Sequence, residues 1–262
     1  MNGSNPRHSR GDIWFRALAG AEPRIETGLR TVLVADVQVA SQQARLIAVV
    51  PDALDDHAAN SAGELGLEEG WVLADQVRDM IAADRSGAKR PIITIIDPRS
   101  QAHGRIEELL GINSSCAAAA DTYAAARKAG HPLIALVVGL SAPGAFLAHG
   151  YQAHRLLAFD NLAAADARDT RYQGGRGRLF QLIAGIDAEA PSRAQIGLVV
   201  ERVAQAVADV RNHPGDLTLR LSNDESMLDR AAGEVRGRFP EPWGSLDQLF
   251  VAEAPAIRLR AG

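Results

Sequence analysis

Two short segments of this chain could do chemistry, because each places a glycine-containing turn directly after an apolar run of strand length. The first strand exit covers residues 97–108 (DPRSQAHGRIEE), and the second strand exit covers residues 139–150 (GLSAPGAFLAHG). Ligands of α/β sheets bind where strands end, and the free amides of a following helix face negative charge. The two strand exits therefore predict a site for an anionic substrate or a developing oxyanion.

The second strand exit has the residue types that such a turn needs. Ser141 could cap a helix, Pro143 suits its first turn, and Gly144 lets a ligand approach the backbone. The amides of Gly144 and Ala145 would then point toward a negative charge. Two other interpretations stay open, in which the glycines serve tight packing alone or Ser141 is a nucleophile. A nucleophile elbow of the G-x-S-x-G type, however, requires glycine where Pro143 stands.

Histidines and acids near the strand exits have both a chemical and a structural interpretation. His103 could donate a proton or bind a substrate carboxylate, or it could be an idle loop side chain. His149 and His154 flank a helix end, where local hydrogen bonds are the expected role. Glu107 and Glu108 stand at a predicted helix start, which the helix dipole favours; the alternative is that one of them orients Arg105 or a partner subunit.

Charge and residue spacing argue against several classes of function. Lys and Arg number 28 against 32 Asp and Glu, for a net charge of -4, so nucleic acid is not an expected partner. No set of His, Cys, Asp and Glu has the spacing of a metal site, and no metal is expected. One local cationic cluster could steer an acidic carrier protein or be ordinary surface charge; it consists of Arg155, Arg171, Arg176 and Arg178.

Length and composition predict one globular domain over residues 14–262, after a frayed tail at residues 1–13. The chain has 262 residues, 47% of them hydrophobic, which is enough for one sizeable core. The polar N-terminus lacks the apolar stretch of a signal peptide, and no run of about 18 apolar residues predicts a membrane helix. The lone Cys116 forms no internal disulfide. A cytoplasmic location is therefore expected, with no membrane partner.

The elements that must position the strand exits follow from hydrophobic patterns. Residues 31–50 contain two β-rich runs that predict an antiparallel pair, and residues 52–66 predict a loop. A helix is predicted from Glu68 onward, and its apolar face is predicted to contain Trp71, Ala74, Val77, Met80 and Ile81.

Three continuous apolar runs predict strands that are covered on both faces, as parallel strands are; they are residues 91–97, 131–139 and 154–159. Between the first two, residues 114–128 are rich in alanine and predict a helix, with Gly130 just past its end. Strand, helix and strand together predict a right-handed crossover.

Beyond the third run, the patterns are weaker. Residues 161–178 have no period and predict an exposed loop, and residues 193–210 predict a helix. A second, charged helix is predicted at residues 224–238, where Pro240 stops it.

The strand exits also carry a family resemblance. SQAHGRIEELLGI at residues 100–112 and SAPGAFLAHGYQAHRLLAF at residues 141–159 resemble the gamma subunits of biotin-independent malonate decarboxylases, in order and spacing. The resemblance extends more loosely over residues 14–160. It implies a crotonase-like α/β fold of the carboxyltransferase branch, in which repeated ββα units form a spiral and C-terminal helices follow.

The resemblance further implies a function that is shared with other chains. The gamma subunit would pair with a beta subunit, be active only in that pair, and decarboxylate malonyl to acetyl on an acyl carrier protein. The substrate is carried on the coenzyme A-like arm of the carrier, so no cofactor is expected on this chain. An acyl-transferase alpha subunit is a further expected partner.

Site residues follow from the resemblance as well. When a malonyl thioester loses carbon dioxide, electrons flow into the thioester carbonyl, and backbone amides that already face this oxygen lower the barrier. The implied catalytic amides belong to Ser100, Gln101, Ala102, Gly144 and Ala145. The implied substrate contacts are Gly139, Ser141, His103 and Gly104.

Two departures from the family pattern leave alternatives open. Pro143 stands where the family commonly has a small residue, and it has no N–H to donate. Family members also have a further strand and a polar active-site stretch, which residues 161–180 do not display. A non-catalytic scaffold subunit is therefore one alternative. Half of a biotin-dependent acyl-CoA carboxyltransferase is another, although HGRIEELLGI and AFLAHGYQA argue against it.

Overall fold

The described residues lie in one compact part of the chain. The computed structural model describes residues 9–39, 41–52, 63–139, 143–159 and 180–214. All of them fall within the first of two compact units, Met1–Asp216, and the second unit is Leu217–Gly262. The expected helix at residues 224–238 and the expected loop at residues 161–178 lie outside the described residues. A single domain over residues 14–262 stays a prediction.

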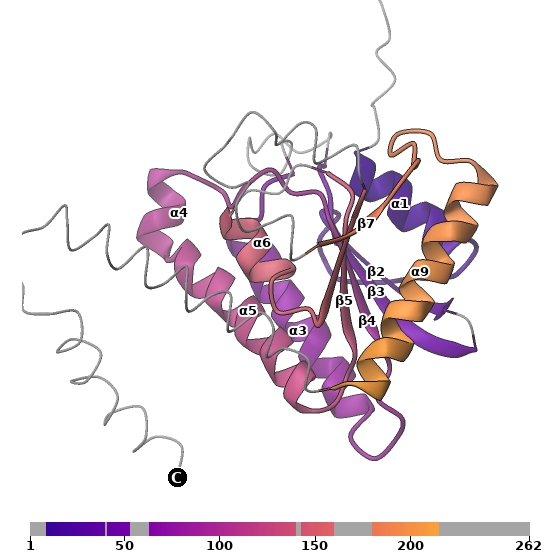
Figure 1. Ribbon diagram of the computed structural model, residues 1–262. Helices are drawn as coiled ribbons and strands as arrows, with labels where there is room; N and C mark the ends of the chain where they lie inside the picture. Colours follow the sequence, from indigo (N-terminus) through magenta and orange to yellow (C-terminus); the bar gives the residue numbers. More distant parts are fainter. Residues whose placement is uncertain (1–8, 40, 53–62, 140–142, 160–179, 215–262) are drawn as a thin grey trace, which may run out of the picture. The chain divides into compact units, whose positions relative to one another are not determined.

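Among the described residues, seven strands form one sheet whose spatial order repeats their order in the chain (Figure 1). The first three strands pair in antiparallel fashion, and every pair from β3 to β7 is parallel. The strands are β1 (Arg24–Ile25), β2 (Val32–Val39), β3 (Gln42–Val49), β4 (Ile92–Ile96), β5 (Leu133–Val137), β6 (Arg155–Phe159) and β7 (Phe180–Ile183).

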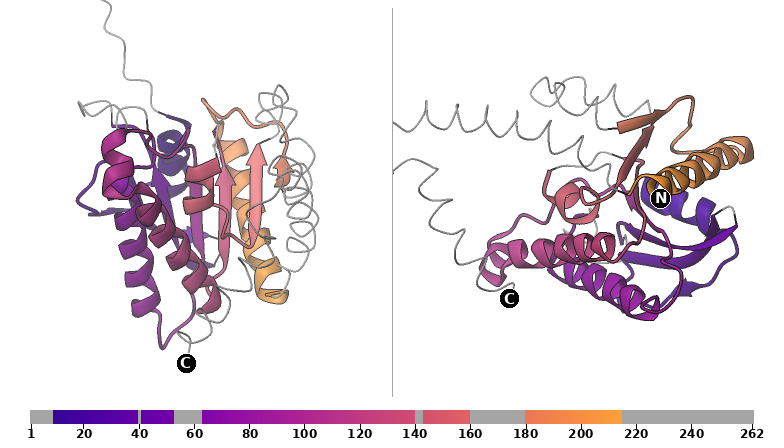
Figure 2. Two further views of the ribbon diagram at one scale, coloured as in Figure 1. Left: turned by 90° about the vertical axis from the view of Figure 1, so that its left-hand side faces the viewer. Right: turned by 60° about the horizontal axis from the view of Figure 1, so that its bottom comes forward.

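Helices cover both faces of this sheet (Figure 2). One face is covered by α1 (Arg10–Ala19) and α9 (Arg193–Asn212). The other face is covered by α3 (Leu67–Ala83), α5 (Ile112–Lys128) and α6 (Pro143–His149). The short helix α4 (Arg105–Leu110) directly precedes α5, and Gly111 in the left-handed conformation separates the two.

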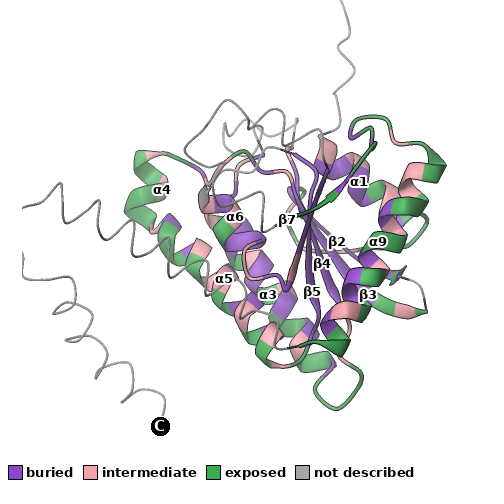
Figure 3. Cartoon of the chain, in the orientation of Figure 1, coloured by how far each residue is buried: buried purple, intermediate pink, exposed green. Residues whose placement is uncertain are grey.

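The central strands confirm the predictions from apolar runs. Every residue of β4 and β5 is buried, because helices cover the sheet on both sides (Figure 3). The antiparallel pair over residues 31–50 is confirmed as β2 and β3. Helix α5 covers residues 114–128 as predicted, and Gly130 beyond its end has a positive φ of 93°.

The apolar face predicted for the helix from Glu68 is partly wrong. Helix α3 does bury Ala74, Val77 and Met80, together with Leu73, which the prediction omitted. Trp71, however, is 47% exposed. The reason is that the buried face turns toward Leu73, so that Trp71 lies at the side of the helix that faces solvent.

Two further predictions need correction. Helix α1 begins at Arg10, so the predicted tail at residues 1–13 is too long; the Ser9 hydroxyl caps this helix by accepting from the Asp12 amide at 3.1 Å. Strand β7 was missed altogether, although it pairs in parallel with β6. The further strand that family members have after β6 is therefore present at Phe180–Ile183. It begins at the end of residues 161–180, the segment in which no strand was recognised from the sequence.

Candidate active site

The two strand exits lie side by side at the carboxyl edge of the sheet. Strands β4 and β5 are parallel neighbours in which Ile96 is opposite Val137. The pairing continues past the strands, because the amides of Val138 and Gly139 both donate to the Ile96 carbonyl, at 3.0 and 3.3 Å. Sequence segments some forty residues apart therefore meet at one place, as the motif interpretation required.

The first strand exit is fixed by the segment that leads into α3. The Leu65 amide donates to the Ser100 carbonyl at 3.0 Å, and the Ala102 amide donates to the Leu65 carbonyl at 2.9 Å. Ala102 is buried. Since an N–H has one proton to donate, the Ala102 amide is already used within the protein, unlike the role the family resemblance implied for it.

Side chains of the first strand exit form a hydrogen-bonded chain. The Ser100 hydroxyl lies 3.2 Å from the Glu64 carboxylate and 3.4 Å from Nδ1 of His103. Nε2 of His103 lies 3.2 Å from the Gln101 side-chain nitrogen. One proton arrangement satisfies all three contacts: Gln101 donates to Nε2, Nδ1–H donates to Ser100, and Ser100 donates to Glu64. His103 is exposed, so its edge can contact a ligand.

The second strand exit contacts these hydrogen-bonded side chains at Gly144. A Cβ at Gly144 would overlap the side-chain oxygen of Gln101 and would lie 3.0 Å from its nitrogen, so the Gln101 amide group occupies the space that a side chain would take. Gly144 follows Pro143, the first residue of α6. In the first turn of a helix, the amides of Gly144 and Ala145 have no acceptor within the helix.

The remaining predicted site residues are placed as follows. Gly139 is buried against Asp97, and a Cβ there would lie 2.7 Å from the Asp97 Cγ. Gly104 is the N-cap of α4, and the Glu107 carboxylate folds back over it. Ser141 lies outside the described residues. The structure thus brings Gly139 and Gly144 to the Asp97 and Gln101 side chains of the neighbouring strand exit.

The hydrogen bonds of His149 to Tyr123 and of His154 to Leu133 are to partners 26 and 21 positions away in the sequence, not to the local groups at a helix end that were expected. The Tyr123 hydroxyl lies 2.9 Å from Nδ1 of His149, and the Leu133 amide donates to Nδ1 of His154 at 3.1 Å. Both rings are buried. Burial lowers the pKa of His149 to about 3, so the ring is neutral near pH 7.

Two site residues were missed from the sequence. Glu64 fell in an expected loop, and only the bridge between Leu65 and Gln101 brings its carboxylate to Ser100. Asp97 belonged to the first strand exit, but its contact with Gly139 depends on the register of β4 and β5. No signal in the sequence reveals either contact.

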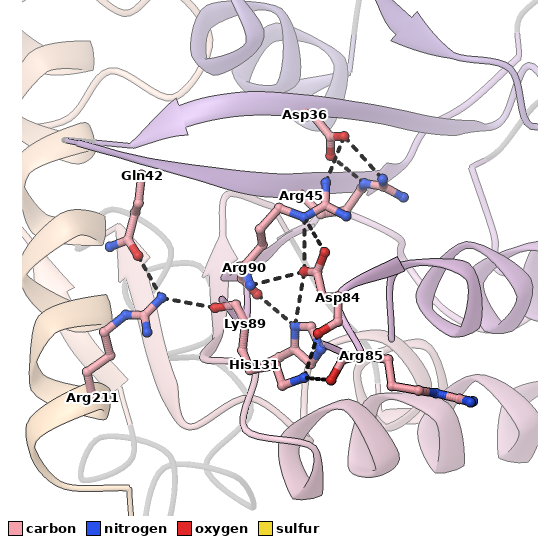
Figure 4. Close-up of polar contacts among 9 residues, drawn as sticks. All are labelled: Asp36, Gln42, Arg45, Asp84, Arg85, Lys89, Arg90, His131 and Arg211. Atoms are coloured by element: carbon pink, nitrogen blue, oxygen red, sulfur yellow. Dashed lines mark hydrogen bonds and ion pairs between the residues drawn. The ribbon is translucent and has the colours of Figure 1, made fainter. Parts of the chain in front are cut away.

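A second polar cluster lies at the opposite, amino edge of β4 and β5 (Figure 4). Arg90 pairs with Asp36 and Asp84, each at 2.9 Å, and Arg45 pairs with Asp36 at 2.6 Å. Nδ1 of His131 lies 2.9 Å from the Arg90 carbonyl. Burial acts to raise the pKa of Asp84, but the hydrogen bonds and charge of Arg90 outweigh it and the pKa is lowered. Each charge here has a partner, which is the arrangement of a structural cluster.

Over the described ranges, no three His, Cys, Asp or Glu side chains gather closely enough to hold a metal ion. In the same part of the chain, no helix is long and apolar enough to cross a membrane. Of the predicted cationic cluster, only Arg155 lies among the described residues.

Comparison with known proteins identifies the family. Residues 58–171 match the family model described as malonate decarboxylase gamma subunit. Over 88% of its length, the chain matches the whole of a chain in a Pseudomonas malonate decarboxylase hetero-tetramer in complex with coenzyme A, with 37% identity and a TM-score of 0.73. The chain belongs to the malonate decarboxylase gamma-subunit family.

Other relatives agree with this gamma-subunit assignment. A chain of the Pseudomonas MdcD-MdcE hetero-dimer is 37% identical, with a TM-score of 0.71, and the match covers 88% of this gamma subunit and 100% of that chain. The malonyl-S-ACP:biotin-protein carboxyltransferase MADD of Malonomonas rubra is 39% identical over 133 residues. That match covers 49% of this chain and 46% of the relative, so it spans less than half of either protein.

A distant match concerns the fold alone. A chain of transcarboxylase 12S is 16% identical, with a TM-score of 0.56, and the match covers 78% of this gamma subunit and 42% of that chain. The predicted crotonase-like α/β fold of the carboxyltransferase branch is thereby confirmed.

Proposed function

We propose that this gamma subunit pairs with a beta-type subunit and that the pair decarboxylates a malonyl thioester carried by an acyl carrier protein. The Pseudomonas relatives support this proposal. One is a hetero-dimer, and the two hetero-tetramers are in complex with coenzyme A and with malonate. The name of the Malonomonas relative supports the carrier, since it specifies malonyl-S-ACP. The acyl-transferase alpha subunit and the cytoplasmic location stay predictions.

The chemistry of the proposal needs little from side chains. The bond between the malonyl carboxylate and Cα breaks, its electron pair enters the thioester carbonyl to give an enolate, and a proton then adds at Cα. The amide of Gly144 would face the enolate oxygen, whereas Ala145, whose amide the resemblance also implied, is fully buried. Amides held in place by a helix cost no reorganisation during the reaction, and each such donor contributes about 100- to 1000-fold in rate.

The single observation that carries the proposal is the contact of Gln101 with Gly144. It brings together the two segments that could bind an oxyanion and a carboxylate. In the proposal, Nδ1–H of the exposed His103 exchanges the Ser100 hydroxyl for the malonyl carboxylate, while Gln101 still donates to Nε2. The Ala102 amide is left out, because it donates to Leu65. Ser141 and the backbone of Gly104 are further proposed substrate contacts.

Helix α4 supports the need for a partner. It directly follows Gly104 and has no buried residue. Its apolar side chains Ile106, Leu109 and Leu110 are 66%, 75% and 69% exposed. Large apolar side chains exposed together mark protein contacts. The proposal assigns them to the beta-type subunit, because the relatives are heteromeric and the helix adjoins the proposed site.

The interface is tested by co-purification of tagged chains. Leu109→Glu should weaken co-purification by at least tenfold, because it would bury a charge without a partner. Leu198→Glu is the matched control, since Leu198 is also exposed but lies on α9, across the sheet. Wild-type co-purification of Leu109→Glu would remove α4 from the interface.

The activity is tested by carbon dioxide release from malonyl-carrier protein. The gamma subunit alone, the beta-type subunit alone and the co-purified pair are compared. Release by the pair only is the expected result. A stable but inactive pair would instead support a scaffold role for this chain.

A second candidate function rests on the printed name of the Malonomonas relative, which is a carboxyltransferase to biotin-protein. The same enolate chemistry would then pass the carboxyl group to biotin. Adding biotinylated carrier to the pair separates the two functions. Carbon dioxide release that does not depend on this carrier favours decarboxylation, and carboxybiotin formation without free release favours transfer.

A further inference from the structure

The side chain of Asp97 joins three elements at the base of the candidate site. Asp97 directly follows β4 and is partly buried. Its Oδ2 accepts from the Gly11 amide at the start of α1, at 2.8 Å. Its Oδ1 lies over Gly139, at a place that a Cβ of residue 139 would overlap. Helix α1 and the two strand exits therefore meet on one carboxylate.

A side chain at either glycine neighbour of this carboxylate would be crowded. A Cβ at Gly11 would lie 3.0 Å from the Cβ of Asp97. A Cβ at Gly139 would lie 3.2 Å from the Asp97 backbone Cα, in addition to overlapping its carboxylate. Rotation of the Asp97 side chain alone cannot relieve a contact with its own Cα. The spacing of the two strands at this point thus depends on Asp97 and Gly139 together.

The same kind of contact occurs again further along the strand exits. Gln101 lies on Gly144 as Asp97 lies on Gly139. In each case, a polar side chain of the first strand exit occupies the space of a missing side chain in the second. Two such contacts, one at the base and one at the candidate site, fix both the separation and the rotation of the two segments.

We propose that Asp97 is a positioning residue of the decarboxylase site, which sets the place of Gly144 through its contact with Gly139. The proposal rests on the proposed function. Asp97 touches no reacting atom in it. Burial raises the pKa of Asp97. Hydrogen bonds from the Gly11 amide and the Ser9 hydroxyl, and the charges of Arg10 and Arg99, oppose this rise.

The first test measures kcat and KM of the co-purified pair for malonyl-carrier protein. Asp97→Ala should lower kcat at least tenfold, with a smaller change in KM. Asp97→Asn should restore most of kcat, because its amide oxygen can accept from Gly11 and its volume is the same. Asp121→Ala, an exposed aspartate on α5, is the matched control. Wild-type kcat and KM in an assembled Asp97→Ala pair would overturn the proposal.

A double-mutant cycle tests the contact itself. Gly139→Ala should lower kcat at least tenfold, and Gly197→Ala should not, because a Cβ at Gly197 meets nothing within 4 Å. In the Asp97→Ala background the carboxylate is gone, so Gly139→Ala should cost clearly less than it does alone. Full additivity of the two losses would contradict a direct contact.

A third measurement does not depend on turnover. Hydrogen exchange of peptides from α6 should be faster in Asp97→Ala than in the wild-type pair, and Asp97→Asn should resemble the wild type. Unchanged exchange in Asp97→Ala would overturn the proposal even if the pair has another activity. If exchange is faster in Asp97→Ala but the wild-type pair releases no carbon dioxide, the positioning role would stand and the decarboxylase function would be removed.

Discussion

Polar groups are partnered differently at the two edges of strands β4 and β5. At the amino edge, carboxylates and guanidinium groups are paired, as in Asp84 with Arg90. At the carboxyl edge, the carboxylates of Glu64 and Asp97 accept from the Ser100 hydroxyl and the Gly11 amide, and the exposed His103 lies between Ser100 and Gln101. Charges that satisfy one another stabilise a fold but are not available to a ligand. The comparison teaches that the groups that stabilise the fold and the groups of the candidate site lie at opposite ends of the same strands.

The largest expected effect is on stability at the amino edge. Asp84→Ala leaves Arg90 short of one partner in a largely buried place, and the free energy of unfolding should fall by about 3 kcal/mol. This is the lower end for a buried pair, because both side chains keep some contact with solvent. Urea denaturation measures the loss. The kcat of the assembled pair should stay within about twofold, and a tenfold fall would mean that the two edges are coupled.

A comparable effect is expected at the carboxyl edge, on activity instead of stability. Gly144→Leu would displace Gln101 and cover the adjacent amides, so kcat for decarboxylation should fall about 100-fold. Gly197→Ala, in open space on α9, is the control. A scaffold subunit would tolerate Gly144→Leu without loss, as long as the pair assembles.

A smaller effect is expected for the exposed ring of His103. His103→Ala should raise KM for the malonyl thioester about tenfold, because it removes one contact to a carboxylate. His103→Gln should recover part of this loss, since it can still donate a hydrogen bond. The unfolding free energy should not change, because the ring is exposed. A large loss of stability would place His103 in the structure and not in the site.

The smallest effect concerns pH and the far end of α6. Burial lowers the pKa of His149 from 6.5 to about 3. Below pH 6.5 the unfolded chain takes up a proton that the folded chain does not, so this stability is present above pH 6.5 and is lost toward pH 3. At pH 5.5 the loss should be on the order of 1 kcal/mol. His149→Gln, which does not titrate, should show a flatter dependence of unfolding free energy on pH; an unchanged slope would contradict the assignment.

The sequence predicted the parts of the fold that depend on local patterns. The runs in β4 and β5 were recognisable because both faces are buried, and α5 because alanine favours helices. Strand β7 was missed because four residues, Phe180–Ile183, give no period to recognise. Trp71 was assigned to the wrong side, because a large apolar residue at helical spacing does not have to face the core.

The site was predictable in outline but not in its contacts. Glycine and polar residues after strands identified both strand exits, and parallel pairing put them together. The partners of Asp97 and Ser100 could not be predicted, because Gly139 and Glu64 reach them only through strand register and a bridge at Leu65. Asp36 and Arg90 are 54 positions apart in the sequence, so their pairing likewise depends on tertiary structure.

The spatial order of the seven strands has a consequence for synthesis of the chain. Since each strand pairs with its neighbour in sequence, the sheet can grow at one edge while the polypeptide leaves the ribosome. Each of the described strands can pair with a neighbour that is already formed, and none of these seven has to be inserted between two others. Asp97 and Gln101 would then be in place before Gly139 and Gly144 are synthesised, so the second strand exit would pack against a first strand exit that has already formed.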